Sequence, residues 1–129
     1  MKAVFLLSLA LTLFGCAMAP EVPDALPVAE RPDIQGRGCP AMAILRVPPK
    51  YPRNAILSGQ EGWVLIEVEY SAYGQVISTQ SLQASPPGVF EHATEVALSN
   101  WRFKASGQPG QCTMVMEFAI AKRRPESVL

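Results

Sequence analysis

The sequence has no excess of charge of either sign. Among its 129 residues, lysine plus arginine number 11, and aspartate plus glutamate also number 11. Without a basic surplus the chain offers no broad positive surface to a phosphate backbone, so nucleic acid is excluded as an expected partner. A chain of this length has room for one small domain beside targeting and linking segments.

Motifs for catalysis, metal binding and cofactor binding are also missing. The sequence contains no phosphate-binding loop, no Ser/His/Asp constellation and no zinc-ligand spacing. Glu91, His92 and Glu95 fall on one turn of an expected helix, where an exposed polar face is the simpler interpretation. We therefore expect a protein that is not an enzyme and that holds neither a metal nor a cofactor.

The N-terminus predicts export into the cell envelope. Lys2 supplies a short positive start, and Ala3 to Phe14 form an apolar run that is short for a membrane span. The sequence from Leu13 to Cys16 resembles the lipobox of bacterial lipoproteins, which predicts a signal peptide over residues 1–15 and a lipid on Cys16. Ala17 then favours the outer membrane, because lipoproteins kept at the inner membrane commonly carry aspartate there.

Two other forms of processing stay open. Cleavage after Ala19 fits the small-residue pattern of ordinary signal peptidase, although Pro20 is a poor residue after the cut. An uncleaved N-terminal anchor is the other alternative. We expect a periplasmic protein held at the membrane, with the lipoprotein form favoured.

Residues 16–47 are expected to be a tether between the lipidated cysteine and the domain. Up to about Gly38 this segment has no sustained helical or strand period, and four prolines punctuate it: Pro20, Pro23, Pro27 and Pro32. Fully extended, a tether of about 30 residues reaches under about 100 Å. At the other end of the chain, residues 122–129 are expected to form a basic tail.

The cysteines predict one disulfide. If Cys16 carries a lipid, Cys39 and Cys112 remain as an even pair in an oxidising compartment. A small domain gains most from a cross-link that closes a long loop. The alternative is two unrelated buried thiols, because sequence does not show whether their Cα atoms lie within bridging range.

Residues 48–121 are expected to form the folded domain. A short helix should start at Tyr51-Pro52 and end at Gly59. A strand from Gly62 follows, in which one face should be core (Val64, Ile66, Val68, Tyr70) and the other wetter (Trp63, Leu65, Glu67, Glu69).

After a turn at Gly74, the remaining pattern predicts a second strand over Gln75 to Ala84, an amphipathic helix and a third strand over Cys112 to Ile120. The helix should present Phe90, Ala93, Ala97 and Trp101 to the core, and Trp101-Arg102-Phe103 should be its end. The expected fold is α+β, a small three-stranded antiparallel sheet with two helices packed on one face.

An ordered series of short motifs resembles the signature of the TonB C-terminal domain family. The series runs Tyr51-Pro52 with Ala55, Glu61-Gly62 with Val64, Gly74 with Val76, Phe90-Glu91, Ala97, and Trp101-Arg102-Phe103. The resemblance implies a periplasmic unit whose relatives bind an extended segment of outer-membrane TonB-dependent receptors, the TonB box, by adding it as a strand beside the last strand.

The partner-binding residues expected on this basis are Tyr51, Pro52, Thr113, Met114, Val115, Met116, Glu117 and Phe118. Met114, Met116 and Phe118 alternate onto one face, and a core stripe explains that face better than a binding surface does.

Two functions stay open. The first is an adaptor for TonB-dependent transport across the outer membrane. The second is a structural envelope lipoprotein that binds another periplasmic partner without energy transduction. The predicted N-terminal run differs from the transmembrane helix of TonB transducers in having no charge or histidine within its apolar core.

The lipobox predicts a mature protein that begins at a diacylated Cys16. Cys16→Ala should abolish lipidation, because only the cysteine thiol carries the lipid, and should release the protein or leave it unprocessed. Mass spectrometry of the mature N-terminus measures this. Membrane-bound protein that retains residues 1–19 would contradict the prediction and favour the uncleaved anchor.

Overall fold

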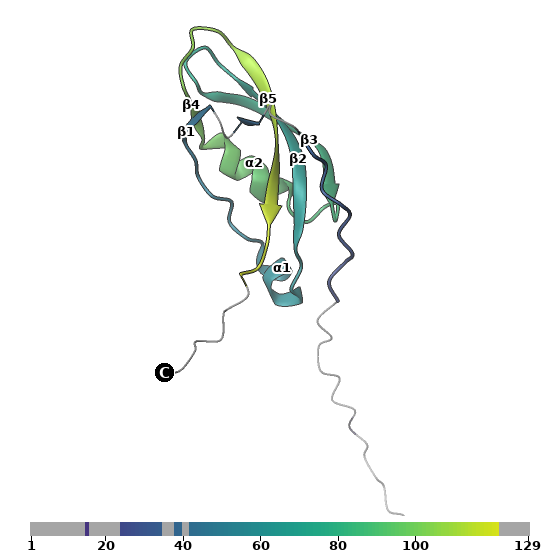
Figure 1. The fold of residues 1–129 in the computed structure, drawn as a ribbon. Coiled ribbons are helices and arrows are strands. Elements are labelled where there is room, and N and C mark those ends of the chain that lie inside the picture. Colours follow the sequence, from purple (N-terminus) through teal and green to yellow (C-terminus); the bar gives the residue numbers. More distant parts are fainter. Residues whose placement is uncertain (1–14, 16–23, 35–37, 40–41, 122–129) are drawn as a thin grey trace, which may run out of the picture.

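A computed structural model describes residue 15 and residues 24–34, 38–39 and 42–121. The elements in chain order are β1 (Ala43–Leu45), α1 (Arg53–Ser58), β2 (Gly62–Tyr70), β3 (Val76–Ser85), α2 (Glu91–Ser99), β4 (Arg102–Phe103) and β5 (Gly110–Phe118). Figure 1 shows their arrangement. Apart from Gly15, the predicted signal peptide lies outside the described residues, as do the predicted lipid site Cys16 and the basic tail.

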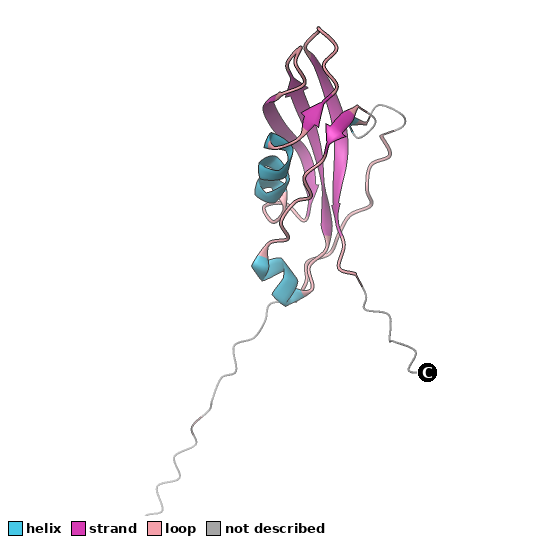
Figure 2. Ribbon diagram, turned by 90° about the vertical axis from the view of Figure 1, so that its left-hand side faces the viewer, coloured by secondary structure: helices cyan, strands magenta, loops and turns pink. Residues whose placement is uncertain are grey.

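The fold is a three-stranded antiparallel sheet with the order β3-β2-β5. The long strands stand side by side, with α2 lying across one face and α1 near one end (Figures 1 and 2). This arrangement confirms the predicted α+β class. Because β2 is the middle strand, its two neighbours are both edge strands.

The inner face of the sheet and α2 enclose the core. Val64, Ile66 and Val68 alternate along β2 and are completely buried, as the strand pattern predicted. From α2, Leu98 reaches the same cluster, and Phe90 joins it from the position just before the helix. Each such side chain contributes about 1.5–3 kcal/mol by leaving water, so this cluster is the main stabilising feature of the domain.

Both helices have recognisable end signals. Pro52 precedes α1 in an extended conformation, and Gly59 ends the helix with a left-handed φ of 66°, as expected from the sequence. At the start of α2, the Glu91 carboxylate accepts hydrogen bonds from the amides of Gly88 (2.7 Å) and Phe90 (3.1 Å). Glu91 therefore satisfies amides at this helix start that would otherwise lack acceptors.

The predicted helix end at Trp101-Arg102-Phe103 is wrong. α2 ends at Ser99, and Arg102–Phe103 form β4, which pairs with β1 in a separate two-stranded sheet. The Phe103 amide also donates to the Gly74 carbonyl at 2.9 Å, which draws the two segments together. A side chain at Gly74 would overlap the Phe103 carbonyl oxygen, so the turn glycine is needed for this approach as well as for its φ of 82°.

The predicted cysteine pair is joined in the structure. The Cys39 and Cys112 sulfur atoms form a disulfide, with their Cα atoms 5.2 Å apart, and both side chains are buried. Cys112 lies in β5, whereas Cys39 belongs to the segment that precedes β1. The disulfide therefore fastens the N-terminal part of the chain to the last strand.

Removing this cross-link should destabilise the domain. We expect the Cys39→Ala/Cys112→Ala variant to lose about 4 kcal/mol of unfolding free energy, because a loop of 73 residues is no longer closed in the unfolded chain. Urea unfolding followed by circular dichroism measures the change. The reduced parent, which keeps both side chains, is the control and should lose a similar amount. Non-reducing mass measurement that finds two free thiols in periplasmic material would contradict the prediction.

Candidate functional site

The candidate binding site is the outer edge of β5. β2 pairs with β5 residue by residue, from Gly62 opposite Phe118 to Tyr70 opposite Gly110, without a register shift. The opposite edge of β5 meets one bridge among the described residues, a parallel contact between Gly38 and Thr113. From Met114 to Phe118 the backbone groups on this edge have no strand partner in the described part of the chain, so an extended peptide can pair there.

The side chains of β5 divide between two faces. Met114, Met116 and Phe118 are 3–8% exposed and belong to the core, in agreement with the core interpretation of this stripe. Val115 is half-buried and Glu117 is exposed on the other face. The expected partner residues on the strand therefore contribute differently. Met114, Met116 and Phe118 fix the position of β5 against the core, whereas the side chains of Thr113, Val115 and Glu117 are reachable by a ligand.

Tyr51 lies at one end of β5 as part of an aromatic cluster. Its ring makes edge-to-face contacts with Phe90 and Phe118, at centroid separations of 5.6 and 5.7 Å, and those two rings stack at 4.3 Å. The Tyr51 hydroxyl donates a hydrogen bond to the Gln60 carbonyl. These contacts give Tyr51 a packing role that fixes the chain entering α1 against the end of the candidate edge.

The environment of Tyr51 favours its neutral form. Burial, and secondarily the nearby Glu61 carboxylate, raise the pKa of the Tyr51 hydroxyl above its usual value of about 10. The tyrosine therefore remains a hydrogen-bond donor throughout the neutral pH range.

Pro52 lies away from the β5 edge, on the helical side of the domain. It lines an apolar hollow of about 470 Å³ between the start of α1 and α2, together with Val89, Ala93 and Val96. Lys50, Arg53 and His92 also line this hollow. Tyr51 lines the same hollow and also packs against Phe118 at the end of β5, so it connects this hollow to the candidate edge.

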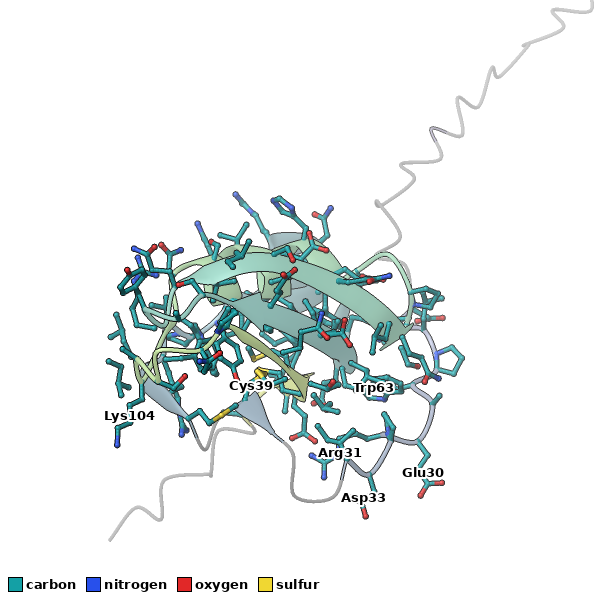
Figure 3. The ribbon with its side chains drawn as sticks, turned by 90° about the horizontal axis from the view of Figure 1, so that it is seen from above. Glu30, Arg31, Asp33, Cys39, Trp63 and Lys104 are labelled. Carbon is teal, nitrogen blue, oxygen red and sulfur yellow. A yellow bond between two sulfur atoms is a disulfide. The ribbon has the colours of Figure 1, made fainter. Side chains whose placement is uncertain are left out.

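Residues 24–34, which were expected to belong to the tether, pack on the sheet. The Ala29 amide donates to Ser85 Oγ at 2.7 Å, and the Ala29 carbonyl accepts the Trp63 indole N–H at 2.8 Å. Arg31 forms an ion pair with Glu117 of β5. Figure 3 shows Arg31, Trp63 and Cys39 along one flank of the domain, and in Figure 2 this segment runs on the side of the strands opposite the helices.

Trp63 corrects one prediction about β2. Its face was expected to be the wetter one, but Trp63 is only 3% exposed. The pattern along β2 correctly gave the face on which the indole lies, but not the segment of chain that covers it. Two large apolar residues, Trp63 and Leu65, at the start of this face were the signal in the sequence that this end of the face has a cover.

No group of three or more potential metal-binding side chains occurs among the described residues. Among the helices that the structure describes, none has both the length and the apolar character needed to cross a bilayer. The outer edge of β5, with the side chains of Thr113, Val115 and Glu117 reachable beside it, suits recognition of an extended peptide segment.

Comparison with known families identifies the family to which the domain belongs. The family model described as "Gram-negative bacterial TonB protein C-terminal" matches residues 47–120, which is more than half of the chain. The chain belongs to the TonB C-terminal domain family.

Relatives in this family include full-length TonB proteins. The chain is 30% identical to Protein TonB of Yersinia enterocolitica over 74 residues, which are 57% of this chain and 29% of that protein. It is 33% identical to Protein TonB of Pseudomonas aeruginosa over 82 residues, or 60% of this chain and 24% of that protein. The match therefore covers less than a third of the length of each of these relatives.

Solved structures of TonB C-terminal domains share the fold. A solution NMR structure of the Pseudomonas aeruginosa TonB C-terminal domain superposes with a TM-score of 0.55 at 32% identity, covering 64% of this chain and 88% of that one. The structure of TonB2 from Vibrio anguillarum gives 0.54 at 25% identity, covering 78% of this chain and 98% of that one. The TonB C-terminal fold is thus shared along most of both solved chains.

The Tyr51 contacts generate a prediction about pH. Because the pKa of Tyr51 is raised in the folded domain, its contribution to stability is present below about pH 10 and is lost as the pH rises through the folded-state pKa. Tyr51→Phe should cost about 1 kcal/mol at neutral pH by removing the bond to Gln60. The unfolding free energy of the Tyr51→Phe variant should also fall less steeply above about pH 10 than the unfolding free energy of the parent.

Urea unfolding at a series of pH values measures both effects. Tyr73→Phe is the matched control, because Tyr73 is 84% exposed, and it should behave as the parent does. Equal alkaline slopes in the parent and in Tyr51→Phe would show that Tyr51 does not carry the effect.

Proposed function

We propose that this TonB C-terminal domain is an envelope docking module that binds an extended segment of a partner protein as an added strand on β5. The observation that carries the proposal is the regular outer edge of β5 from Met114 to Phe118, which has no strand partner among the described residues. An added strand gains affinity from backbone hydrogen bonds, and the side chains that point outward set its specificity.

The two edges of the sheet are not equivalent, and the difference favours β5. Pairing between β2 and β3 shifts register twice, between Leu65 and Ile66 and between Glu69 and Tyr70, whereas pairing between β2 and β5 is regular. Register irregularities twist an edge and interrupt its ladder, which makes strand addition less favourable. β5 is therefore the edge better suited to a partner strand.

The buried side chains of β5 support docking by keeping the strand in place. Met114, Met116 and Phe118 pack into the core, so the backbone edge is preformed and a ligand does not have to order it. On the outward face, Val115 offers an apolar contact and Glu117 an acidic one. An extended segment with small apolar residues and a basic group opposite Glu117 fits these positions.

The partner we propose is an outer-membrane TonB-dependent receptor, reached from the periplasm. Similarity to TonB proteins supports this choice, whereas the lipobox at Cys16 favours the alternative of a structural envelope lipoprotein. The proposal covers docking as a transport adaptor. It includes neither energy transduction nor any enzymatic step, because a strand can dock through the edge of β5 without either.

Hydrogen exchange measured by NMR tests the docking edge directly. In the free domain, alternate amides of β5 are protected because they bond to β2, and the amides between them are not. Adding a synthetic TonB-box peptide should slow exchange at the intervening amides between Met114 and Phe118, by a factor that grows with peptide concentration. Val115→Thr should keep this effect, because it changes a side chain while leaving the backbone donor in place.

β3 provides the control within the same experiment. Its outer amides should exchange at the same rate with and without peptide. Peptide-dependent protection on β3 instead of β5, or binding without new protection on either strand, would overturn the proposed docking mode.

A further inference from the structure

Three outward-facing residues form a row across the sheet. Ser85 of β3 pairs with Trp63 of β2, which in turn pairs with Glu117 of β5, so the three residues lie side by side on the face opposite α2. Two residues of the N-terminal segment contact all three strands: Ala29 bonds to the first two members of the row, and Arg31 pairs with the third. We call residues 24–34 the strap.

A further pair of hydrogen bonds fixes the beginning of the strap. The Leu26 amide donates to Gln60 Oε1 at 2.6 Å, and Gln60 Nε2 donates to the Leu26 carbonyl at 3.1 Å. Gln60 is only 4% exposed, so this reciprocal contact uses a buried amide group that has few other partners. The strap is thus held to the domain largely through its own backbone groups, at Leu26 and at Ala29.

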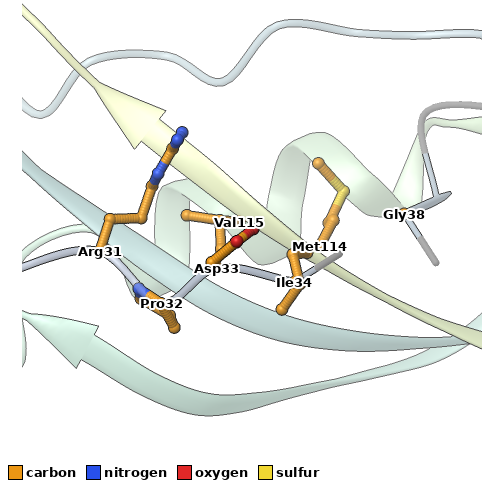
Figure 4. Close-up of a pocket in the computed structure, with 7 residues that line it drawn as sticks. All are labelled: Arg31, Pro32, Asp33, Ile34, Gly38, Met114 and Val115. Carbon is orange, nitrogen blue, oxygen red and sulfur yellow. The ribbon is translucent and has the colours of Figure 1, made fainter. Parts of the chain in front are cut away.

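Beyond Ala29 the strap continues beside the candidate edge of β5. Residues 31–34 and Gly38 line a hollow of about 250 Å³ together with Met114 and Val115 (Figure 4). Gly38 bridges Thr113, and the next residue is held to β5 by the disulfide at Cys112. A partner strand on Met114 to Phe118 has to occupy the space that the strap borders.

We propose that the strap is a displaceable cover, and that its docking on the Ser85–Trp63–Glu117 row governs the access of a partner strand to β5. This inference rests on the proposed function of β5 as a docking edge. The disulfide remains fixed when the strap leaves, so Cys39 acts as the pivot and the strap opens only the part of the edge beyond Thr113.

The strap is held loosely compared with the core. Its apolar side chains stay partly in solvent, with Leu26 54% and Val28 44% exposed. The ion pair between Arg31 and Glu117 is more than half exposed on both sides, where such pairs contribute little. Segments with few buried apolar contacts open at low free-energy cost, so a competing strand can displace this one.

The strap also sets how tightly a partner binds. If only a fraction of molecules has the strap released, the apparent dissociation constant is raised by the inverse of that fraction. Weakening the strap should therefore tighten peptide binding without changing any residue of β5. If the strap is docked in nine molecules of ten, releasing it completely should lower the apparent dissociation constant of the peptide by at most about tenfold.

Ala29→Pro tests this proposal. Proline removes the amide that donates to Ser85 but keeps the carbonyl that accepts the Trp63 indole N–H. Glu30→Pro is the matched control, because Glu30 is the next residue, is also exposed, and makes none of the strap's hydrogen bonds to the sheet.

Two measurements are made on the parent and on both variants. NMR exchange of the Trp63 indole N–H, assigned with Trp63→Phe, reports strap docking without any ligand. Calorimetry with a synthetic TonB-box peptide reports access to β5. We expect Ala29→Pro to speed indole exchange several-fold and to tighten peptide binding by a similar factor, whereas Glu30→Pro should change neither.

Faster indole exchange with unchanged peptide affinity would overturn the proposal, because the strap would then leave without opening the edge. Indole exchange that is already fast in the parent, or equally slow in Ala29→Pro, would overturn it as well.

If no form of the protein binds the peptide, the proposed docking function fails. The docking of the strap is then judged by the Trp63 indole N–H alone: faster exchange in Ala29→Pro than in Glu30→Pro supports a strap that can be released from the Ser85–Trp63–Glu117 row, and equal rates refute it.

Discussion

The structure depends on covering both faces of its middle strand. β2 presents three completely buried side chains, Val64, Ile66 and Val68, to one side and Trp63 to the other. A sheet of three strands cannot shield both sides by itself, so a second layer is needed on each. α2 supplies one layer, and residues 24–34 supply the other over the Trp63 end of the strand.

The two layers differ in strength, and this difference shapes the behaviour of the domain. The inner layer is a cluster of buried apolar side chains that includes Phe90 and Leu98. The outer layer is an extended segment held by a few hydrogen bonds and an exposed ion pair. Local opening takes place first where few apolar contacts are buried, so the outer cover is the part of the fold best able to move while the core stays intact.

The disulfide connects this cover to the candidate binding edge. Cys112 lies within β5 and Cys39 follows the strap, so the chain that crosses the outer face must return to the last strand at a fixed point. One edge of β5 is fully used by β2, and the other is flanked by the chain's own N-terminal segment. The strand on which a partner would dock, β5, and the segment that would compete with that partner, the strap, therefore belong to the same chain.

Strand alternation by itself determined which residues of β2 and β5 face the core, and glycines at 59 and 74 determined where α1 and the hairpin turn end. These signals are local, because side-chain direction follows from backbone period. Burial of Trp63, the β1–β4 pairing and the docking of the strap were decided only by the tertiary structure. Each depends on segments far apart in the sequence, and a segment held mainly through its backbone leaves no periodic side-chain pattern from which its partner can be read.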